Sequence, residues 1–236
     1  MKLRPVLVRP EQPRNAGAVL RAAANFAADR PCLVGVGHWG PEQMRELRVA
    51  SSGAWDALGP PRFVNELREA VTDCAVVVGS SSRRRSGDHD AETPAGLFSR
   101  LARTEGTAAL LLGAEACGLT RADFMFCHVI VRIPTAEDFP SLNVAQAAAI
   151  LLYQWQAVTS LCNPREACAK VTDVGRQEIV LSLWGNLLEM AGEWPETRLP
   201  GVRARARRLL HRALPDGEDL ALLASLARGL MRRLRG

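Results

Sequence analysis

The sequence lacks the features that mark membrane proteins and exported proteins. It contains no run of about 18 apolar residues, so no transmembrane helix is predicted. Residues 1–12, MKLRPVLVRPEQ, break up their apolar side chains with charges and prolines, which argues against a signal peptide. We therefore expect a cytoplasmic protein that has no membrane partner.

Common signatures of metal binding and hydrolytic catalysis are missing as well. There is no phosphate-binding G-x-x-x-x-G-K-[ST] segment, and no dinucleotide-binding site of the G-x-G-x-x-G type is expected. The four histidines are scattered, without partners that would form a hydrolytic triad, so each is interpreted as a surface or structural residue. The cysteines form no C-x-x-C pair and no paired Cys/His spacing, so most are interpreted as small buried hydrophobic residues and no metal site is expected. They are Cys32, Cys74, Cys117, Cys127, Cys162 and Cys168.

Positive charge is concentrated at the C-terminal end of the chain. Residues 198–236 contain ten arginines and three acidic residues, although the net charge of the whole chain is only +5. Such a segment indicates a polyanionic partner, and the absence of aromatic residues in it favours nucleic acid over a membrane. A solvated helix face is the alternative. The excess of arginine over lysine is also explained by genome composition, which weakens the argument.

Apolar segments alternate with helical patterns through the first two thirds of the chain. Short apolar runs bounded by glycine and proline predict buried strands. These runs are at residues 5–9, 31–37, 74–79, 108–112 and 129–133, and helical patterns lie between most of them. The alternation predicts an α/β domain with one doubly wound, mainly parallel sheet that is covered on both faces.

The C-terminal third is predicted to form a separate, all-helical module. A polar segment at 163–174 is interpreted as a linker between a domain at 1–162 and a second domain at 175–236. Apolar residues at helical spacing predict helices at 177–191 and 203–214, and another after the turn at 215–217. The helix at 203–214 is expected to bury Val202, Ala206, Leu209, Leu210 and Ala213 and to expose Arg203, Arg205, Arg207, Arg208 and Arg212.

Residues 113–154 carry the most unusual pattern in the chain. A glycine turn follows the strand at 108–112, and the irregular loop after the strand at 129–133 leads into a long helix at 142–160. Loops that leave the carboxyl ends of neighbouring strands usually bind the ligand of an α/β sheet. The helix is apolar on nearly every side, so we expect it to be buried in a core or in a subunit interface.

Two earlier loops have the character of an anion site. After the strand at 5–9, Asn15 is predicted to cap a helix, whose free amides and dipole would attract an anion. Arg21 lies about two turns further along that helix. The strand at 74–79 is followed by Ser80, Ser81, Ser82, Arg83, Arg84 and Arg85. We favour a phosphate- or cofactor-contacting loop there over a disordered surface run.

Three of these segments resemble the motifs of the SPOUT class of RNA methyltransferases, which carry a trefoil knot. NAGAVLR at 15–21 is similar to the N-x-G-x-x-x-R motif of the class. GAEACGLT at 113–120 resembles its glycine-glutamate-glycine-leucine motif, although Ala116 stands where the class often has arginine. The segment at 133–148 is similar to its IP…SLN-A-A motif. The resemblance implies a C-terminal trefoil knot in the first domain.

Two further segments resemble the TrmH/TrmJ-like branch of that class. The serine and arginine loop at 80–85 is similar to the G-T-[ST]-A-R-x-R segment of TrmJ-like tRNA 2′-O-ribose methyltransferases, with serine in place of threonine and alanine. The C-terminal helices resemble, more loosely, the RNA-binding extension of those enzymes. The resemblance implies S-adenosylmethionine as cofactor, tRNA as RNA partner, and a homodimer that can borrow Arg21 from the partner subunit.

The target implied by the resemblance is the 2′-hydroxyl of the first pyrimidine in the tRNA anticodon loop. A ribosomal RNA or tRNA wobble-position enzyme of the same fold is an alternative, and so is a non-catalytic RNA-binding module. The implied catalytic residues are Arg21, Ser141 and Asn143, and the implied cofactor-binding residues are Ser80, Ser81, Ser82, Gly113, Ile133, Ser141, Leu142 and Asn143. The implied substrate-binding residues are Asn15, Arg83, Arg84, Arg85, Glu115, Arg203, Arg207 and Arg208.

Overall fold

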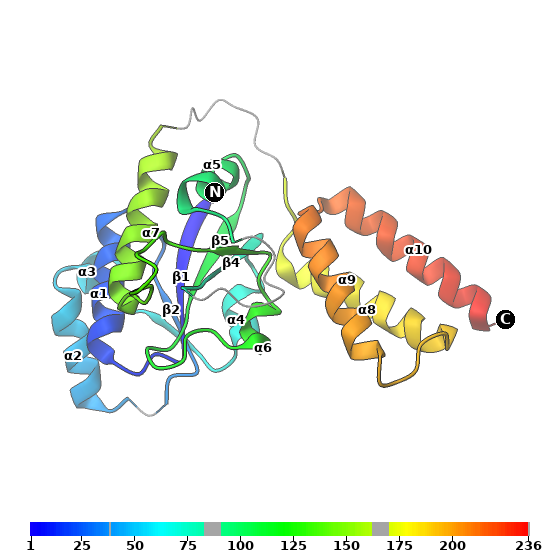
Figure 1. Ribbon diagram of the computed structural model, residues 1–236, viewed down its shortest axis with the longest axis horizontal. Coiled ribbons are helices and arrows are strands. Elements are labelled where there is room, and N and C mark those ends of the chain that lie inside the picture. Colours follow the sequence, from blue (N-terminus) through cyan, green and yellow to red (C-terminus); the bar gives the residue numbers. More distant parts are fainter. Residues whose placement is uncertain (38, 83–90, 162–169, 236) are drawn as a thin grey trace.

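A computed structural model describes residues 1–37, 39–82, 91–161 and 170–235, and it shows a sheet domain followed by three helices (Figure 1). The six strands are arranged in the order β3-β2-β1-β5-β4-β6, and every neighbouring pair is parallel. They are β1 (Lys2–Val8), β2 (Cys32–Val34), β3 (Arg62–Val64), β4 (Val76–Ser80), β5 (Thr107–Leu112) and β6 (Val129–Val131). The predicted parallel α/β sheet is confirmed.

Helices cover both faces of the sheet, as the apolar strands require. One face packs against α1 (Pro13–Asn25), α5 (Pro94–Leu101) and α7 (Val144–Thr159), with α2 (Pro41–Ser51) and α3 (Ala54–Leu58) lying against α1. The opposite face packs against α4 (Leu67–Val71) and the segment around α6 (Arg121–Phe124). Figure 1 shows the first group of helices on the side of the sheet away from the C-terminal helices.

Alternating side chains of the central strands supply the two halves of the core. In β1, Leu3 and Leu7 belong to the cluster beneath α1 and α7, whereas Val6 and Val8 belong to the cluster beneath α4. This is the period of two that a pleated strand imposes. Each of these four side chains is at most 1% exposed. The sheet is therefore a rigid platform whose carboxyl-end loops carry the candidate site.

The start of α1 differs from the prediction. The helix begins at Pro13, with Gln12 as the N-cap residue, so Asn15 lies inside the helix and the predicted N-cap at Asn15 is wrong. Proline is well suited to the first helical position, because an N–H group at that position has no hydrogen-bond partner within the helix and its absence in proline costs nothing. Asn15 is thereby free to make tertiary hydrogen bonds with its side chain.

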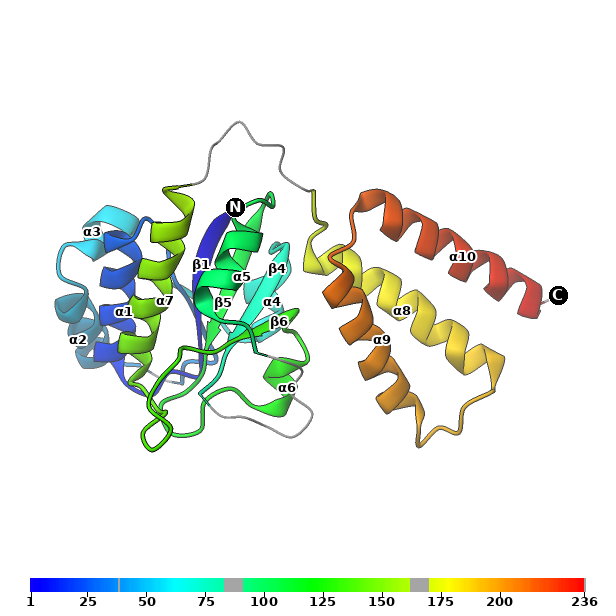
Figure 2. The same ribbon diagram turned by 45° about the horizontal axis from the view of Figure 1, so that its top comes forward.

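The C-terminal module consists of α8 (Val174–Ala191), α9 (Leu199–Ala213) and α10 (Gly217–Arg235), which extend away from the sheet domain (Figure 2). Its small core is formed by Val180, Leu220 and Ala224. Within α9 the predicted burial of Leu209 and Ala213 is wrong, because both are exposed, Leu209 by 55%, and His211 is buried instead. Arg207 and His211 lie on the inward face of α9, and Leu209 lies about 200° around the helix axis from Arg207.

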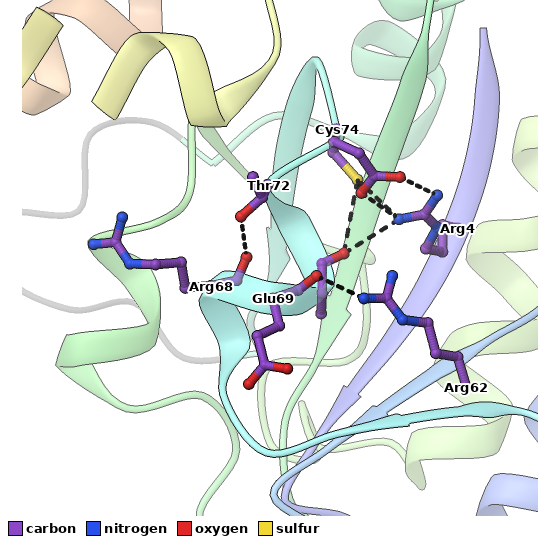
Figure 3. A network of polar contacts seen from close by, with 8 residues as sticks. Arg4, Arg62, Arg68, Glu69, Thr72 and Cys74 are labelled. Carbon is purple, nitrogen blue, oxygen red and sulfur yellow. Dashed lines mark hydrogen bonds and ion pairs between the residues drawn. The ribbon is translucent and has the colours of Figure 1, made fainter. Parts of the chain in front are cut away.

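The first turn of α8 is attached to the turn between α4 and β4. The amide of Val174 donates to the Cys74 carbonyl over 2.8 Å, and the amide of Gly175 donates to the Thr72 carbonyl over 3.0 Å. Figure 3 shows Thr72 and Cys74 in a polar network with Arg4, whose guanidinium forms two hydrogen bonds with Asp73. Burial raises the pKa of the Cys74 thiol to about 12, so this thiol stays protonated at neutral pH.

Residues 163–169 of the predicted linker lie outside the described residues. Among the described cysteines, Cys32, Cys74 and Cys127 are buried as predicted, and Cys117 is exposed. In the part of the chain that the structure describes, no helix is long and apolar enough to cross a membrane.

Candidate functional site

A cavity of about 530 Å³ lies at the carboxyl ends of the central strands. Its walls come from the first turn of α1, the ends of β4, β5 and β6, and the loop that leads into α7. This is the position at which parallel α/β sheets bind their ligands, and the volume suits a cofactor-sized molecule. The motifs read from the sequence therefore meet in one place, although more than 120 residues separate the first from the last.

All eight residues predicted to bind a cofactor line this cavity. They are Ser80, Ser81, Ser82, Gly113, Ile133, Ser141, Leu142 and Asn143. Asn15 and Glu115, which were assigned to the substrate, also line it. The cavity further includes Gln12, Cys117, Phe124, Phe139 and Gln146, to which the sequence interpretation had assigned no role. A sequence pattern gives no signal for such residues, because their place depends on how the loops fold over the sheet.

A hydrogen-bond network centred on Glu115 joins the three motif segments. Its carboxylate accepts hydrogen bonds from the amide of Glu11 (2.9 Å), the amide of Gln12 (3.3 Å) and Nδ2 of Asn15 (2.8 Å). Oδ1 of Asn15 in turn accepts a hydrogen bond from Nδ2 of Asn143. Charge-assisted hydrogen bonds of this kind are stronger than neutral ones. The network fixes the loop before α1 against the start of α7.

Asn143 has a second role as the N-cap of α7. Its Oδ1 accepts hydrogen bonds from the amides of Ala145 (2.8 Å) and Gln146 (3.4 Å). This side-chain oxygen satisfies amides that have no partner within the helix. One amide side chain thus caps the helix through its oxygen and holds Asn15 through its nitrogen.

The turn at Gly113 brings two backbone segments into direct contact. A Cβ atom at Gly113 would lie 2.2 Å from the carbonyl carbon of Gly118 and from the nitrogen of Leu119. Only glycine permits so close an approach. Gly118 itself has a φ of +69°, a left-handed conformation that glycine adopts without strain. These two glycines fold the wall of the cavity back on itself.

A partly buried ion pair lies beside this wall. The Arg9 guanidinium donates to both oxygens of Asp123, over 3.1 and 2.5 Å, and Thr120 donates to the same carboxylate through its amide and its hydroxyl. Burial raises the pKa of Asp123, but the hydrogen bonds from Arg9 and Thr120 outweigh it and hold the pKa below its usual value. Arg9 has a φ of +52°, which is strained for a residue with a side chain.

The loop after β4 is only partly described. The hydroxyl of Ser80 donates to the Leu111 carbonyl over 2.8 Å, so this side chain ties β4 to β5. Arg83, Arg84 and Arg85 lie outside the described residues.

Arg21 is exposed on α1 and does not line the cavity of its own chain. The neighbouring surface is apolar: Phe26 at the end of α1 contacts Tyr153 of α7 edge to face, with ring centroids 5.8 Å apart. In α7 the expectation of burial on nearly every side holds for Leu151 and Trp155, whereas Ile150 and Tyr153 are exposed.

The arginines of α9 fall into two groups. Arg203 donates to Glu189 and to the Gly185 carbonyl, and Arg207 forms two hydrogen bonds with Glu178, so both are directed at α8. Arg205, Arg208 and Arg212 are exposed and have no ion pair among the described residues. Their spacing of three and four places them on one helix face. We call these three residues the arginine ridge.

Neither metal binding nor dinucleotide binding is supported by the residues of the cavity. No group of three histidine, cysteine, aspartate or glutamate side chains within the described ranges is arranged to hold a metal ion. The spacing G-x-G-x-x-G does occur once, at 35–40 between β2 and α2, so the sequence interpretation that excluded this spacing is wrong. Its glycines do not line the cavity.

Comparison with known proteins places these features in context. Residues 2–153 match the sequence model of the SpoU rRNA Methylase family. The tRNA (cytidine/uridine-2′-O-)-methyltransferase TrmJ of Sodalis glossinidius is 30% identical over 230 residues, which cover 95% of this chain and 89% of that protein.

Solved structures agree with this result. The crystal structure of TrmJ from Z. mobilis ZM4 superimposes with a TM-score of 0.82 at 27% identity and covers 98% of this chain and 100% of its own, so the match includes the three C-terminal helices. The SpoU methyltransferase AviRb from Streptomyces viridochromogenes, solved in complex with the cofactor AdoMet, has a TM-score of 0.51 at 25% identity, covering 69% of this chain and 59% of that one.

Proposed function

Because the chain belongs to the SpoU rRNA Methylase family, we propose that it is a cytoplasmic, S-adenosylmethionine-dependent tRNA 2′-O-ribose methyltransferase with a trefoil-knotted first domain. The observation that supports this most directly is the cavity in which all eight predicted cofactor-binding residues meet. The target we favour is the first pyrimidine of the anticodon loop. A tRNA wobble-position ribose or ribosomal RNA is the second candidate.

The residues of the cavity suit the binding of S-adenosylmethionine. Small side chains and glycine turns leave backbone groups accessible around Gly113, Ile133 and Leu142, and these would hold the adenosine. The bound cofactor supplies a methyl group on a sulfonium, which is an excellent leaving group. The protein then needs mainly to align this methyl group with the attacking oxygen.

The acceptor, a ribose 2′-hydroxyl, is a weak nucleophile next to a phosphate. In the reaction its oxygen forms a bond to the methyl carbon, the carbon–sulfur bond breaks, and the hydroxyl proton passes to a base or to water. We assign Arg21 the task of holding the phosphate bidentately and stabilising the developing alkoxide. A guanidinium with a pKa above about 12 is poorly suited to act as the base itself. Ser141 and Asn143 would orient these groups.

In this proposal Arg21 acts in the cavity of a second copy of the chain, because it does not line the cavity of its own chain. The exposed apolar side chains of α7, Ile150 and Tyr153, lie on the same side of the domain as α1 and its Arg21. A homodimer that buries this surface would present Arg21 of each subunit to the cavity of the other. An isologous twofold interface produces two such shared sites.

Mixing two inactive variants tests whether the sites are shared. If Arg21 acts in the partner's site, a heterodimer of R21A and N143A contains one intact site, and random mixing restores roughly a quarter of wild-type activity. If Arg21 acts within its own subunit, every site carries a defect and no activity returns. Arg45→Ala, which removes an exposed arginine from α2, is the control for loss of charge.

We place the tRNA body against the arginine ridge of α9. Of the residues predicted to bind substrate there, Arg208 is free, whereas Arg203 and Arg207 are engaged with α8. Replacing all three ridge residues with alanine is expected to weaken tRNA binding and to lower the slope of log affinity against log salt by about 2 to 3. Full retention of the salt dependence would exclude the ridge.

The decisive test of function is methyl transfer from labelled S-adenosylmethionine to total tRNA, compared with ribosomal RNA, followed by mapping of the modified nucleotide. Label on a ribose of the anticodon loop is expected, and Arg21→Ala should lower transfer by at least about 100-fold with a modest effect on RNA affinity. Label confined to ribosomal RNA would show that the substrate is ribosomal RNA and not tRNA. No transfer by the wild type to either RNA would favour a non-catalytic binding module.

A further inference from the structure

Two buried histidines from different domains stack at the contact between the sheet domain and the helical module. The rings of His128, which precedes β6, and His211 of α9 are 4.0 Å apart and inclined by only 11°. The two residues are 7% and 1% exposed. The methyl-transfer chemistry makes no use of either histidine, so their burial requires another explanation.

Hydrogen bonds define which ring nitrogen of His128 carries the proton. Its Nδ1 accepts a hydrogen bond from the amide of Val77 over 3.1 Å, so the ring proton must be on Nε2. Nε2 lies 3.1 Å from Oε1 of Gln177 and donates to it, and Nε2 of Gln177 donates to the Thr172 carbonyl over 2.8 Å. Gln177 is fully buried. The first turn of α8 is therefore bonded to β4 through a neutral histidine.

A second set of polar contacts surrounds this stack. The buried carboxylate of Glu178 accepts two hydrogen bonds from Arg207 of α9, over 2.9 and 2.6 Å. It also lies 3.6 Å from Arg68 of α4, in the sheet domain. With the two amide bonds from Val174 and Gly175, these contacts connect α8 and α9 to α4 and to the turn between α4 and β4.

We propose that this stack and its hydrogen bonds form a rigid joint, and that Gln177 and His211 are positioning residues that set the orientation of the helical module toward the RNA. The inference rests on the proposed function. His128, Gln177 and Glu178 have one geometry that satisfies their hydrogen bonds, and each lost bond would leave a buried polar atom without a partner, whereas an apolar contact tolerates sliding. The ring nitrogens of His211 have no hydrogen-bond partner among the described residues, so His211 contributes to the joint through its stacking on His128. The arginine ridge then stays at a constant distance from the cavity.

A constant distance has a consequence for the choice of substrate. Phosphate contacts on the ridge carry no sequence information, but they fix the register of an RNA on the protein. A rigid joint would therefore select the nucleotide that reaches the cavity when the body of the RNA is bound. A loosened joint would leave the catalytic domain intact and would weaken the binding of a large RNA that contacts both parts at once.

The experiment compares Gln177→Ala and His211→Ala with two controls. Asn186→Ala removes an exposed amide from the same helix, α8, and His211→Phe keeps a flat ring for stacking. Small-angle X-ray scattering of the full-length proteins reports the spread of domain orientations. Steady-state methylation of whole tRNA and of an isolated anticodon stem-loop separates KM from kcat, and a binding assay gives the affinity for S-adenosylmethionine.

The two alanine variants are expected to have a larger radius of gyration and a KM for whole tRNA that is raised about tenfold, with kcat, cofactor affinity and stem-loop methylation unchanged. His211→Phe and Asn186→Ala should resemble the wild type. Unchanged scattering with an unchanged KM would overturn the proposal, and so would a parallel loss of kcat and cofactor affinity. If the wild type methylates no RNA, the proposed function fails, and the scattering comparison alone then decides whether the joint exists.

Discussion

Asn143 donates a hydrogen bond from its Nδ2 to Oδ1 of Asn15 over 3.2 Å, although the two residues are 128 positions apart in the chain. The bond joins the first turn of α1 to the N-cap of α7, and Glu115 extends it to the turn after β5. Three loops that each follow a different strand are thereby fixed relative to one another. Removal of any of the three side chains should disturb the whole wall of the cavity.

Glu115→Ala tests this network. The substitution removes the acceptor of three hydrogen bonds, so we expect the free energy of unfolding to fall by about 2 kcal/mol. Methyl transfer should fall at least about tenfold, because the loop before α1 is no longer held. Glu105→Ala, an exposed carboxylate before β5, should change neither quantity. Equal effects of the two substitutions in thermal unfolding and activity assays would contradict the role of Glu115.

Gly113→Ala should collapse the cavity wall. The added methyl group would meet the backbone at Gly118 and Leu119, which cannot move without opening the turn. We expect a loss of about 3 kcal/mol of stability and loss of cofactor binding.

At Gly201 in α9 nothing lies within 4 Å of an added Cβ. Gly201→Ala should therefore stabilise the protein by about 0.5–1 kcal/mol, measured by denaturant unfolding.

The ion pair between Arg9 and Asp123 should show coupling in a double-mutant cycle. Asp123 is only 4% exposed, so Arg9→Ala leaves a buried carboxylate with Thr120 as its remaining donor. We expect a loss of about 2 kcal/mol, moderated by the exposure of Arg9. Adding Asp123→Asn to this variant should recover about 1 kcal/mol, because the unpaired charge is gone. Simple additivity of the two effects in urea denaturation would refute the pairing.

Stability should fall at acidic pH because of the histidine joint. Burial lowers the pKa of His211 to about 4, with Arg207 acting in the same direction and Glu178 and the Cys127 backbone opposing it. Burial and the adjacent His211 lower the pKa of His128. Since the unfolded chain binds protons near pH 6.5 and the folded chain does not, stability is complete above that pH and is lost progressively toward pH 4.

For His211 this mechanism predicts a free energy of unfolding about 2 kcal/mol lower at pH 5 than at pH 8. His211→Phe has no proton to bind at this position, so its unfolding free energy should vary less with pH across the same range. Thermal or urea unfolding between pH 5 and 8 measures both proteins. An equally steep pH dependence in the variant would show that the histidine does not cause it.

The sequence by itself determined the class of fold, and it predicted a set of residues that the structure brings together around one cavity. Strands such as residues 108–112 are hydrophobic on both faces, and both faces are buried when helices cover a parallel sheet on each side. Gly113 was identifiable because a tight turn needs glycine locally, and Asn143 was singled out by its resemblance to a family motif. Arg21 was singled out by its resemblance to a family motif, and its role remains a prediction.

Tertiary structure alone decided what the polar side chains contact. Asn15 has the character of an N-cap, yet Pro13 starts the helix earlier and the Asn15 side chain bonds Glu115 instead. The arginines of α9 look alike in the sequence, but only the packing of α8 separates the paired ones from the ridge. His128 and His211 gave no pattern at all. A side chain's partner across more than 80 residues depends on the packing of whole elements, and no local preference encodes it.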